Sequence, residues 1–482
     1  MWGKGWGWGA PRRAPQPGSS RTAVLSTLRG FTMAEVTVVG GGLSGSEAAY
    51  QLAERGHDVT LYEMRPVRGT PAHNTELLGE IVCSNTFKSE DPQNAHGLLK
   101  LEMDALGIGG SLLLACARES RIPGGTALTV DRTEFAGRMT AAIEAHPRIR
   151  VVREEMQALP DGPAIVATGP LTSDALSQSI RGSLGDQGLA FFDAIAPVVS
   201  AESLDMDKLF YASRWGKGGD EDYLNAPMDR EQYEAFIQAL NTGEPYAGHD
   251  WENVPYFEGC LPIEVMAGRG VDTLRFGPMK PVGLPVPWND GKWAHAVIQL
   301  RREDRAGNMW NLVGFQTRLK IPEQKRIFHT IPGLENAEFL RWGSIHRNTY
   351  LNSPACLSPH GSLRDRPELI FAGQITGVEG YTESTAVGIL AAANLDRVVR
   401  GLEPAVPPPT TMMGGLMRYL RESDPQHFAP MNSNFGLLDP LDVVVKKKEL
   451  KREKLVERAR ADFAAWMETN GITGGVETAA AR

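Results

Sequence analysis

A short β-branched run that ends in a glycine-rich loop constrains the fold of this chain more than any other feature. Residues 35–39 are Glu-Val-Thr-Val-Val, the loop 40–45 is Gly-Gly-Gly-Leu-Ser-Gly, and helix-forming residues occupy 46–55. This pattern predicts a strand, a tight turn and a helix. A second apolar strand, 58–62, delivers Glu63 about 20 residues beyond the glycines, the place of the ribose-binding carboxylate in a dinucleotide-binding unit. The sequence therefore predicts a Rossmann-type α/β domain.

Each glycine of the loop has its own predicted task. Gly40 permits the tight turn, Gly42 lets a pyrophosphate approach the backbone, and Gly45 lets helix and strand pack closely. The amides at the helix N-terminus then bind the phosphates. The cofactor-binding residues predicted here are Gly40, Gly41, Gly42, Leu43, Ser44, Gly45 and Glu63. A loop that serves only as a turn is the alternative, which the strand, helix and acidic residue in their expected places disfavour.

Two later segments bear on which dinucleotide binds. Residues 164–169 form an apolar strand that ends in a glycine, and residues 369–374 form another, followed by a helix with apolar side chains at helical spacing. This arrangement resembles the two-part FAD-binding fold of glutathione-reductase-like flavoproteins. The positive N-terminus of the helix suits negative charge on a reduced flavin, so we predict FAD rather than NAD. The residues added to the cofactor site are Gly169, Gly373, Gln374 and Gly380. Another core strand and helix is the alternative.

Composition limits the class of protein. The chain has 482 residues, 42% hydrophobic and 22% charged, which is ordinary for a globular protein with a cofactor domain and a substrate domain. The net charge of -8 argues against a uniformly basic nucleic-acid surface, so any nucleic-acid contact must be local. Four scattered cysteines show no metal-like spacing, and no apolar run reaches the ~20 residues of a membrane span. We expect a reduced, cytoplasmic protein without a metal site or a transmembrane helix.

Residues 1–32 differ from the rest of the chain. They are rich in Gly, Trp, Pro, Arg and Ser and contain no Asp or Glu, which favours disorder. Because Met33 stands directly before the first predicted strand, we expect an upstream extension or a misplaced start. An organellar transit peptide is the alternative, although the amphipathic pattern is poor.

Three segments are far more specific than the glycine loop. They are Cys-Ser-Asn-Thr-Phe-Lys-Ser at 83–89, Phe-Glu-Gly-Cys-Leu-Pro-Ile-Glu at 257–264, and Gly-Pro-Met-Lys-Pro-Val-Gly-Leu at 277–284. With His-Arg-Asn-Thr at 346–349, they resemble TrmFO, the family of folate- and FAD-dependent tRNA (uracil-5-)-methyltransferases. The related MnmG family shares the glycine loop and the Phe-Ala-Gly-Gln segment, so the cysteine segments separate the two. MnmG-like chains are also expected to carry a longer helical C-terminal region.

The resemblance implies a reaction. It implies formation of 5-methyluridine at position 54 of the tRNA T loop, with 5,10-methylenetetrahydrofolate as carbon donor and FAD reduced by NAD(P)H. Uracil C5 becomes nucleophilic only after C6 is attacked, and a thiolate suits that attack, so we assign Cys260 as the nucleophile. The resemblance places Cys83 near the flavin, where it holds or activates the one-carbon unit or transfers a proton. An exchange of the two roles stays open. The alternative functions are an MnmG-like wobble-uridine enzyme, another FAD oxidoreductase and a noncatalytic, flavin-stabilised RNA-binding protein.

Other candidate residues carry weaker patterns. Arg347 can bind a carboxylate of folate bidentately and Asn348 can pair with the pterin edge, although both could equally stabilise a turn. Cys116 follows an apolar run and Cys356 lacks a polar motif, so we expect both in the core.

Transfer RNA requires local positive charge. Residues 446–460 carry eight basic and three acidic residues on a predicted helix, for which RNA contact and a solvated face are equal alternatives. Splayed-out bases are held by stacking as well as by charge. The other candidates of these two kinds are Arg214, Lys217, Lys280, Arg301 and Arg302, with Trp215, Tyr256, Phe257 and Phe276.

The domain plan follows from the breaks in the pattern. We predict a glutathione-reductase-like FAD-binding Rossmann domain in two pieces, 33–195 and 336–482, with an inserted α+β substrate domain at 196–335. The oligomeric state stays open.

Overall fold

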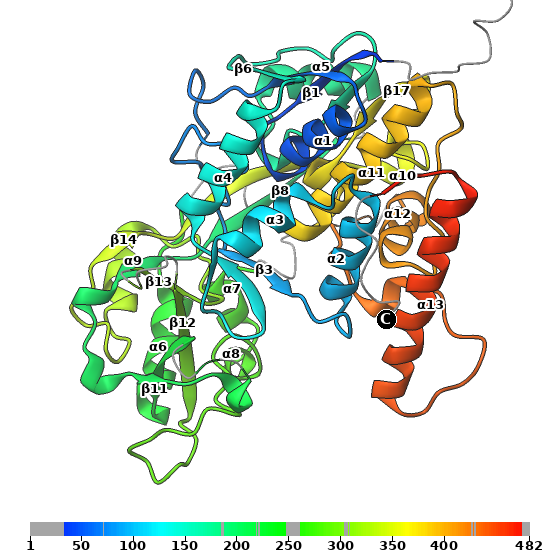
Figure 1. The fold of residues 1–482 in the computed structure, drawn as a ribbon. Helices are drawn as coiled ribbons and strands as arrows, with labels where there is room; N and C mark the ends of the chain where they lie inside the picture. The colour runs from blue at the N-terminus through cyan, green and yellow to red at the C-terminus, as the bar shows by residue number, and fades with distance from the viewer. Residues whose placement is uncertain are drawn as a thin grey trace, which may run out of the picture.

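The computed structural model of the chain describes residues 33–474, except residues 71, 185–187, 218, 220–221, 247–260, 303–306, 308, 426–427 and 429. The leader 1–32 and Cys260 therefore lie outside the described residues. Two lobes are visible in Figure 1, one built around β1 and α1 and the other around β11 and β12.

The first lobe contains a mainly parallel six-stranded sheet. Its strand order is β16 (Ser362–Leu363), β17 (Arg366–Phe371), β7 (Ala164–Val166), β1 (Glu35–Val39), β2 (Asp58–Tyr62) and β6 (Ile149–Val152). Only β16 pairs antiparallel with its neighbour. Central β1 pairs with β2 on one side and with β7 on the other, so the connections diverge from β1. Such a switch point leaves a crevice at the carboxyl ends of the strands.

Helices cover this sheet and build its core. They are α1 (Leu43–Glu54), α2 (Ala95–Leu106), α3 (Leu112–Glu119), α4 (Arg132–Ala145), α5 (Asp174–Leu184), α10 (Ser353–Cys356), α11 (Tyr381–Val399), α12 (Met412–Glu422) and α13 (Lys448–Thr469). Helix α1 packs directly on α11, and fully buried side chains such as Leu52, Leu61 and Ile389 fill the space around them. The strand, turn and helix predicted around the glycine loop are confirmed, as is a helix over most of residues 446–460.

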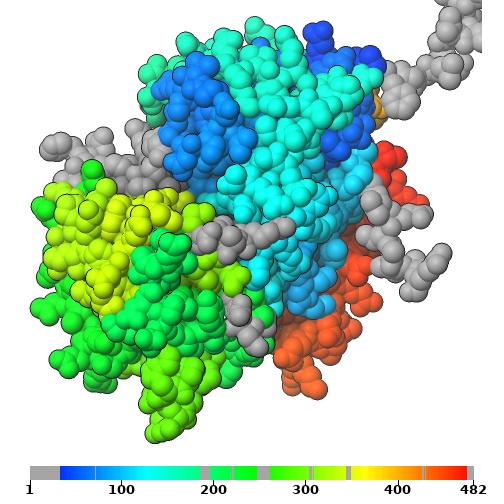
Figure 2. Space-filling view, turned by 60° about the vertical axis from the view of Figure 1, so that its left-hand side comes forward, coloured from blue at the N-terminus to red at the C-terminus, as the bar shows by residue number. Residues whose placement is uncertain are grey.

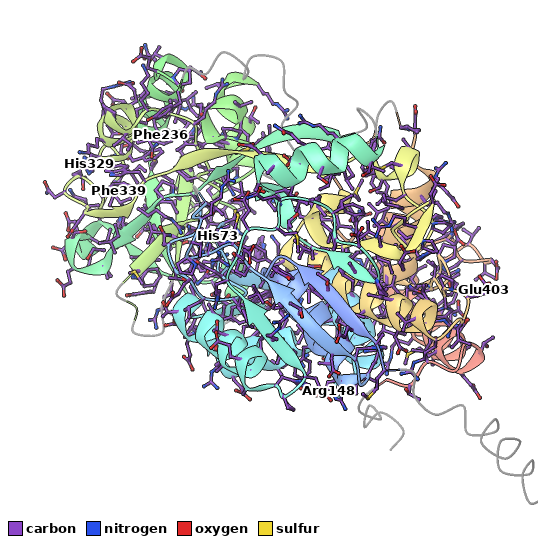
Figure 3. The ribbon with its side chains drawn as sticks, turned by 90° about the horizontal axis from the view of Figure 1, so that it is seen from above. His73, Arg148, Phe236, His329, Phe339 and Glu403 are labelled. Carbon is purple, nitrogen blue, oxygen red and sulfur yellow. The ribbon has the colours of Figure 1, made fainter. Side chains whose placement is uncertain are left out.

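The second lobe is an antiparallel sheet with helices packed against it. Its strand order is β10 (Phe210–Tyr211), β11 (Tyr223–Met228), β12 (Ala296–Arg302), β13 (Met309–Leu312), β9 (Val198–Ser200) and β14 (Phe339–Arg341). Its helices are α6 (Arg230–Thr242), α7 (Ile263–Gly268), α8 (Thr273–Phe276) and α9 (Ile321–Phe328). It has a hydrophobic core of its own, to which Phe236 belongs and against which the partly buried Phe339 packs (Figure 3).

Two further sheets join the lobes. Strands β8 (Gly188–Ile195) and β15 (Ser344–Leu351) form an antiparallel pair, and β3 (Thr86–Ser89), β5 (Ala127–Val130) and β4 (Arg121–Ile122) form a small sheet. Strand β14 follows residue 336 yet pairs with β9, so the second sheet extends past the predicted start of the second cofactor-domain piece. The reason is that the chain returns to the first lobe only with β15. The domain boundaries themselves remain predictions.

Candidate functional site

A cleft opens at the carboxyl ends of β1, β2 and β7, the crevice that the strand order creates. Val39, Tyr62 and Ala167 mark these strand ends in its wall, and the cleft with its mouth holds about 1030 Å³ of empty space. Predicted cofactor-binding residues in its lining are Gly40, Gly42, Leu43, Ser44, Glu63, Gly169 and Gln374. The fold therefore gathers residues from distant parts of the chain around one elongated space.

The remaining predicted residues stand behind this lining. A Cβ atom on Gly45 would lie 1.8 Å from the carbonyl oxygen of Gly40, which is the close helix-to-strand approach that only glycine permits. Gly380 is the N-cap of α11 with φ +104°, and a Cβ on Gly373 would lie 2.8 Å from Ser44 Cβ. Gly41 donates its N–H to Glu63. These residues shape the cleft without lining it.

The start of α1 suits a phosphate group. The first turn of α1 contains no acidic residue, and nothing lies within 4 Å of the place where a Cβ on Gly42 would stand. Ser44 Oγ is buried, lines the cleft, and lacks a hydrogen-bond partner among the described residues. Unfilled helix amides and an orphaned hydroxyl are the donors that a pyrophosphate requires. The residues present therefore fit a dinucleotide.

Glu63 is held in place by Gly41 and Arg65. Its Oε2 accepts the N–H of Gly41 at 2.9 Å, and its Oε1 accepts both the N–H and the Nε–H of Arg65 at 3.0 Å. Burial would raise the pKa of Glu63, but the hydrogen bonds and charge of Arg65, with the Gly41 amide, hold it below its ordinary value. The carboxylate therefore stays charged, and its remaining lone pairs can accept from a ribose hydroxyl.

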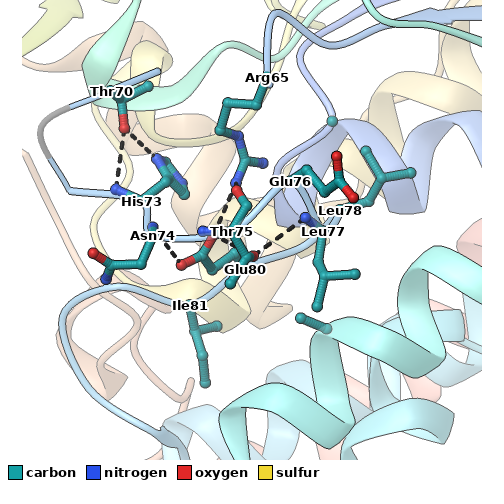
Figure 4. Close-up of polar contacts among 12 residues, drawn as sticks. Arg65, Thr70, His73, Asn74, Thr75, Glu76, Leu77, Leu78, Glu80 and Ile81 are labelled. Atoms are coloured by element: carbon teal, nitrogen blue, oxygen red, sulfur yellow. Dashed lines mark hydrogen bonds and ion pairs between the residues drawn. The ribbon is translucent and has the colours of Figure 1, made fainter. Parts of the chain in front are cut away.

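Arg65 also ties the cleft to a loop that the sequence did not point to. Its Nη1 donates to Glu80 at 2.9 Å, and Glu80 accepts the amides of Asn74 and Thr75 and the hydroxyl of Thr75 (Figure 4). Arg65, Glu80 and His73 line the cleft. An arginine two residues beyond the ribose carboxylate was the available signal.

Tyr381 connects this cleft with the segment of Cys83. Tyr381 opens α11 and lines the cleft, and its hydroxyl oxygen accepts the amides of Cys83 at 2.7 Å and Ser84 at 3.1 Å. Burial and the neighbouring Cys83 raise the pKa of Tyr381, so the phenol stays protonated. An aromatic residue directly after Gly380, at the start of the predicted helix, was a signal that sequence reasoning passed over.

Cys83 itself lines a second cavity, between the two lobes. Cys83, Ser84, Thr86 and Lys88 contribute from the first lobe, and Ala196, Leu261, Met266, Pro278, Arg301, Asn311, Val313, Gly314 and Gln316 form the rest of the wall. The cavity holds about 770 Å³ of empty space. Leu261, which directly follows Cys260 in the chain, thus lines the same cavity as Cys83, whereas Cys260 lies outside the described residues.

A buried asparagine fastens the Cys83 segment to the second lobe. Asn85 is fully buried; its Oδ1 accepts from Arg301 Nε at 2.9 Å and its Nδ2 donates to the carbonyl oxygens of Arg302 at 2.5 Å and Val130 at 3.3 Å. Arg301, predicted as a basic RNA contact, is 7% exposed and lies in the wall of the cavity rather than on the outer surface.

The other candidates have varied surroundings. Cys116 and Cys356 are buried as expected, and burial raises the pKa of Cys116 to about 12 and that of Cys356 to about 11. Arg347 and Asn348 lie in strand β15, not in a turn. Tyr256 and Phe257 lie outside the described residues, and helix α13 keeps Leu455, Val456, Ala459, Phe463 and Trp466 buried. RNA contact through α13 remains a prediction.

The described part of the chain contains neither a membrane-spanning helix nor a cluster of metal ligands. No helix there is long and apolar enough to cross a membrane. Nor do three or more His, Cys, Asp or Glu side chains gather among those residues in a way that could hold a metal ion.

Comparison with known proteins gives one consistent family. The family model of glucose inhibited division protein A matches residues 35–403. A methylenetetrahydrofolate--tRNA-(uracil-5-)-methyltransferase TrmFO of Pelobacter propionicus is 54% identical over 435 residues, covering 90% of this chain and 94% of that protein. The corresponding protein of Geobacter sulfurreducens is 52% identical over 435 residues, covering 90% and 99%.

Solved structures agree on the fold. GidA of Aquifex aeolicus superposes with a TM-score of 0.63 at 16% identity in one crystal form, covering 90% of this chain and 73% of that chain. A second crystal form gives 0.63 at 18% identity, covering 91% and 77%. At this identity the likeness concerns the fold alone, and it confirms the predicted α/β class.

Proposed function

This chain belongs to the TrmFO family of methylenetetrahydrofolate--tRNA-(uracil-5-)-methyltransferases, and we propose that it methylates C5 of a tRNA uracil with FAD as bound cofactor. The proposed product is 5-methyluridine at position 54 of the T loop, with NAD(P)H as reductant and the cytoplasm as the place of action. One observation carries the proposal beyond family likeness. Tyr381 lines the dinucleotide cleft and binds the amides of Cys83 and Ser84, which line the interdomain cavity.

The cleft offers each part of FAD a partner. Ser44 and the first amides of α1 would hold the pyrophosphate, and Glu63 would accept from a ribose hydroxyl. The start of α11, where Tyr381 and Ser384 line the cleft, would place the positive end of a helix against the ring system. When bound, FAD would supply the two electrons that reduce the transferred carbon to a methyl group.

Tyr381 would position the Cys83 segment against the ring system. Because its hydroxyl accepts two consecutive amides, the backbone of Cys83 and Ser84 is fixed relative to the wall of the cleft. We propose that Cys83 acts on the one-carbon unit or moves a proton there. Tyr381, which lines the cleft, thus contacts two residues that line the cavity.

Cys260 is the proposed uracil nucleophile. Its sulfur would form a bond to C6, and the electron pair of the C5–C6 double bond would move toward the O4 carbonyl, which makes C5 nucleophilic. After C5 has gained the one-carbon unit, loss of the C5 proton and departure of the thiolate restore the aromatic base. Its neighbour Leu261 lines the cavity of Cys83, which supports a shared reaction space.

The folate is proposed to contact Arg347 and Asn348 of β15. This strand pairs with β8 and carries the chain back from the second lobe. A guanidinium and an amide supply the donors that a glutamate tail and a pterin edge require.

An MnmG-like wobble-uridine enzyme is the weaker candidate. This chain covers 94% and 99% of two TrmFO relatives but 73% of the Aquifex GidA chain. Identity points the same way, at 54% and 52% to the two TrmFO relatives and 16% to the Aquifex GidA chain.

The test is an assay of unmodified tRNA with methylenetetrahydrofolate and NADH or NADPH, with 5-methyluridine measured after nuclease digestion. The wild-type protein should form it, Cys260→Ala should form none, and Cys356→Ala, which changes a buried core thiol, should retain activity. Absence of product with the wild-type holoenzyme, or undiminished product with Cys260→Ala, would overturn the proposal.

A further inference from the structure

An exposed tryptophan on the second lobe is held in an unusual backbone conformation. Trp215 is 62% exposed and has φ +60°, a left-handed value that bulky side chains rarely adopt. Backbone strain of this kind costs free energy and, where it is retained, concentrates at functional positions. The structure thus presents a large apolar ring to solvent at an energetic cost.

The turn that carries Trp215 is firmly anchored on both sides. The N–H of Trp215 donates to the carbonyl oxygen of Gly283 at 2.9 Å, and Arg214 donates to the Val282 carbonyl oxygen and, at 3.0 Å, to Gln299 Oε1. Gly283 is buried beneath the ring, and a Cβ there would lie 2.7 Å from the indole. The ring is therefore set in one orientation rather than left loose.

A second exposed tryptophan stands at a right angle to the first. Trp293 is 49% exposed, and its ring centroid lies 6.1 Å from that of Trp215 with an interplanar angle of 89°. Trp293 forms an isolated antiparallel β-bridge with Pro285. The N–H of Val286 donates to the carbonyl oxygen of Lys292 and closes the loop between them. We call Trp215 and Trp293 the tryptophan pair.

Three exposed lysines and one exposed acid, Asp290, lie close to the pair in the sequence, although the whole chain carries a net charge of -8. Lys217 lies two residues after Trp215, Lys292 directly precedes Trp293, and Lys280 lies three residues before Gly283. All three are exposed. Aromatic faces next to lysines suit a polyanion that also offers flat rings, which is the chemistry of unpaired RNA.

The pair also lies near the junction of the lobes. The hydroxyl of Tyr223, eight residues beyond Trp215, donates to the carbonyl oxygen of Gly124 of the first lobe at 3.4 Å. Pro278, in the segment that leads to Gly283, lines the interdomain cavity. Figure 2 shows the second lobe in green and lime, in contact with the cyan part of the first lobe. A bulky RNA that reaches the cavity would extend over this surface.

We propose that the tryptophan pair is a stacking platform for unpaired bases of the substrate tRNA other than the uracil that reacts. The proposal rests on the proposed function for the identity of the RNA. One base stacks on the face of Trp215, Trp293 closes the side of that stack, and the three lysines neutralise the adjoining phosphates. The platform fixes tRNA affinity and register and takes no part in the chemistry.

The test compares Trp215→Ala and Trp215→Phe with Trp342→Phe. Trp342 follows β14, at the opposite edge of the second sheet from β10, and stacks on Phe339 at 4.1 Å, so it provides a matched tryptophan distant from the pair. With saturating methylenetetrahydrofolate and NADPH, Trp215→Ala should raise KM for an unmodified tRNA transcript about tenfold, the loss of one stacked base. Its kcat and its KM for the folate should not change. Trp215→Phe, which keeps a flat ring, should lie near the wild type.

Binding is followed separately by quenching of tryptophan fluorescence during titration with the same transcript. Trp215→Phe should lose part of the quenching, and Trp342→Phe should retain it. An unchanged tRNA KM in Trp215→Ala, or equal quenching in the wild type and Trp215→Phe, would overturn the platform. So would a change of oligomeric state in Trp215→Ala, because the pair would then serve a second copy of the chain. A wild type that binds the tRNA without methylating it would instead overturn the proposed function.

Discussion

Asn85 Oδ1 and Arg301 Nε meet at 2.9 Å across the boundary between the two lobes, although 216 residues separate them in the chain. Asn85 is two residues beyond Cys83, and Arg301 lies in the wall of the cavity that Cys83 lines. Together with the hydrogen bond from Asn85 Nδ2 to the Arg302 carbonyl oxygen, this contact holds the second lobe against the segment that carries the thiol.

Asn85→Ala should lower both stability and turnover. It leaves a buried guanidinium Nε–H without this partner, a change that costs about 1–3 kcal/mol. Asn225→Ala is the matched control, because Asn225 is equally buried and its side chain bonds, among the described residues, to Gln299 and three carbonyl oxygens of the second lobe. Chemical denaturation should show similar losses for both variants, while kcat should fall further in Asn85→Ala. Equal kcat in the two variants would contradict a positioning role.

Tyr381→Phe should reduce turnover and alter the flavin absorption spectrum. The variant keeps the ring but removes the acceptor of the Cys83 and Ser84 amides, so the segment loses its tie to the cleft. Tyr233→Phe is the control, since it removes one hydrogen bond of 2.6 Å to the Val271 carbonyl oxygen inside the second lobe. Turnover and flavin spectrum should respond to Tyr381→Phe alone. A wild-type spectrum and rate in that variant would refute the link between cleft and cavity.

Gly45→Ala should abolish cofactor retention. The added Cβ would lie 1.8 Å from the Gly40 carbonyl oxygen, so α1 must move away from β1, with a loss of about 1–3 kcal/mol. Gly137→Ala, inside α4 with nothing within 4 Å of the new Cβ, should instead stabilise the protein by roughly 0.5–1 kcal/mol. The flavin-to-protein absorbance ratio and Tm measure both effects. Full flavin content in Gly45→Ala would show that the close approach is dispensable.

Stability should fall as pH rises through the range set by Glu102. Burial raises the pKa of Glu102 from 4.5 to about 8, against the lowering effect of the Met413 and Met412 amides that it accepts. Between these two pKa values the folded state holds a proton that the unfolded state has released. The contribution of Glu102 to the free energy of unfolding is therefore complete below about pH 4.5 and is lost as the pH approaches about 8. Glu102→Gln imitates the protonated carboxyl and should flatten the decline of Tm across this window. The exposed Glu449 of α13 provides a control in Glu449→Gln, which should leave the decline as steep as in the wild type.

The two cysteines should separate in a trapping experiment with tRNA that contains 5-fluorouridine. Fluorine at C5 cannot leave as a proton does, so an adduct between the nucleophilic sulfur and C6 accumulates. Cys83→Ala should still form this adduct and Cys260→Ala should not, as judged by a shift in gel electrophoresis under denaturing conditions. The reverse pattern would exchange the roles of the two thiols.

Local patterns explain how much of this fold could be predicted. The glycine loop, the strand before it and Glu63 lie within 29 residues, so periodicity and turn chemistry identify them. Tyr381 and Cys83 are 298 residues apart, and their hydrogen bond exists only because α11 packs next to the cleft. No spacing rule reports such a contact. Recognition of the 83–89 segment as special was possible, whereas its tie to Tyr381 was not.

The burial of Arg301 and the position of β14 were likewise beyond the sequence. Arg301 looks like a surface base because arginine is rarely buried, and Asn85, its partner, belongs to the other lobe. The second piece of the cofactor domain was predicted to start at residue 336, but the chain pairs once more with β9 before it leaves the second sheet. Pairing partners, not turns, decide where a sheet ends.

Strands β8 and β15 carry the chain out to the second lobe and back, and Ile195 faces Ser344 in their ladder. Partners in such a ladder stand about 5 Å apart, so the whole excursion starts and finishes at one point of the parent fold. In evolutionary terms the second lobe is therefore a single insertion into the dinucleotide-binding fold. It could be gained, lost or exchanged for another without rethreading the dinucleotide-binding sheet, and a tight hairpin between β8 and β15 would close the gap that its removal leaves.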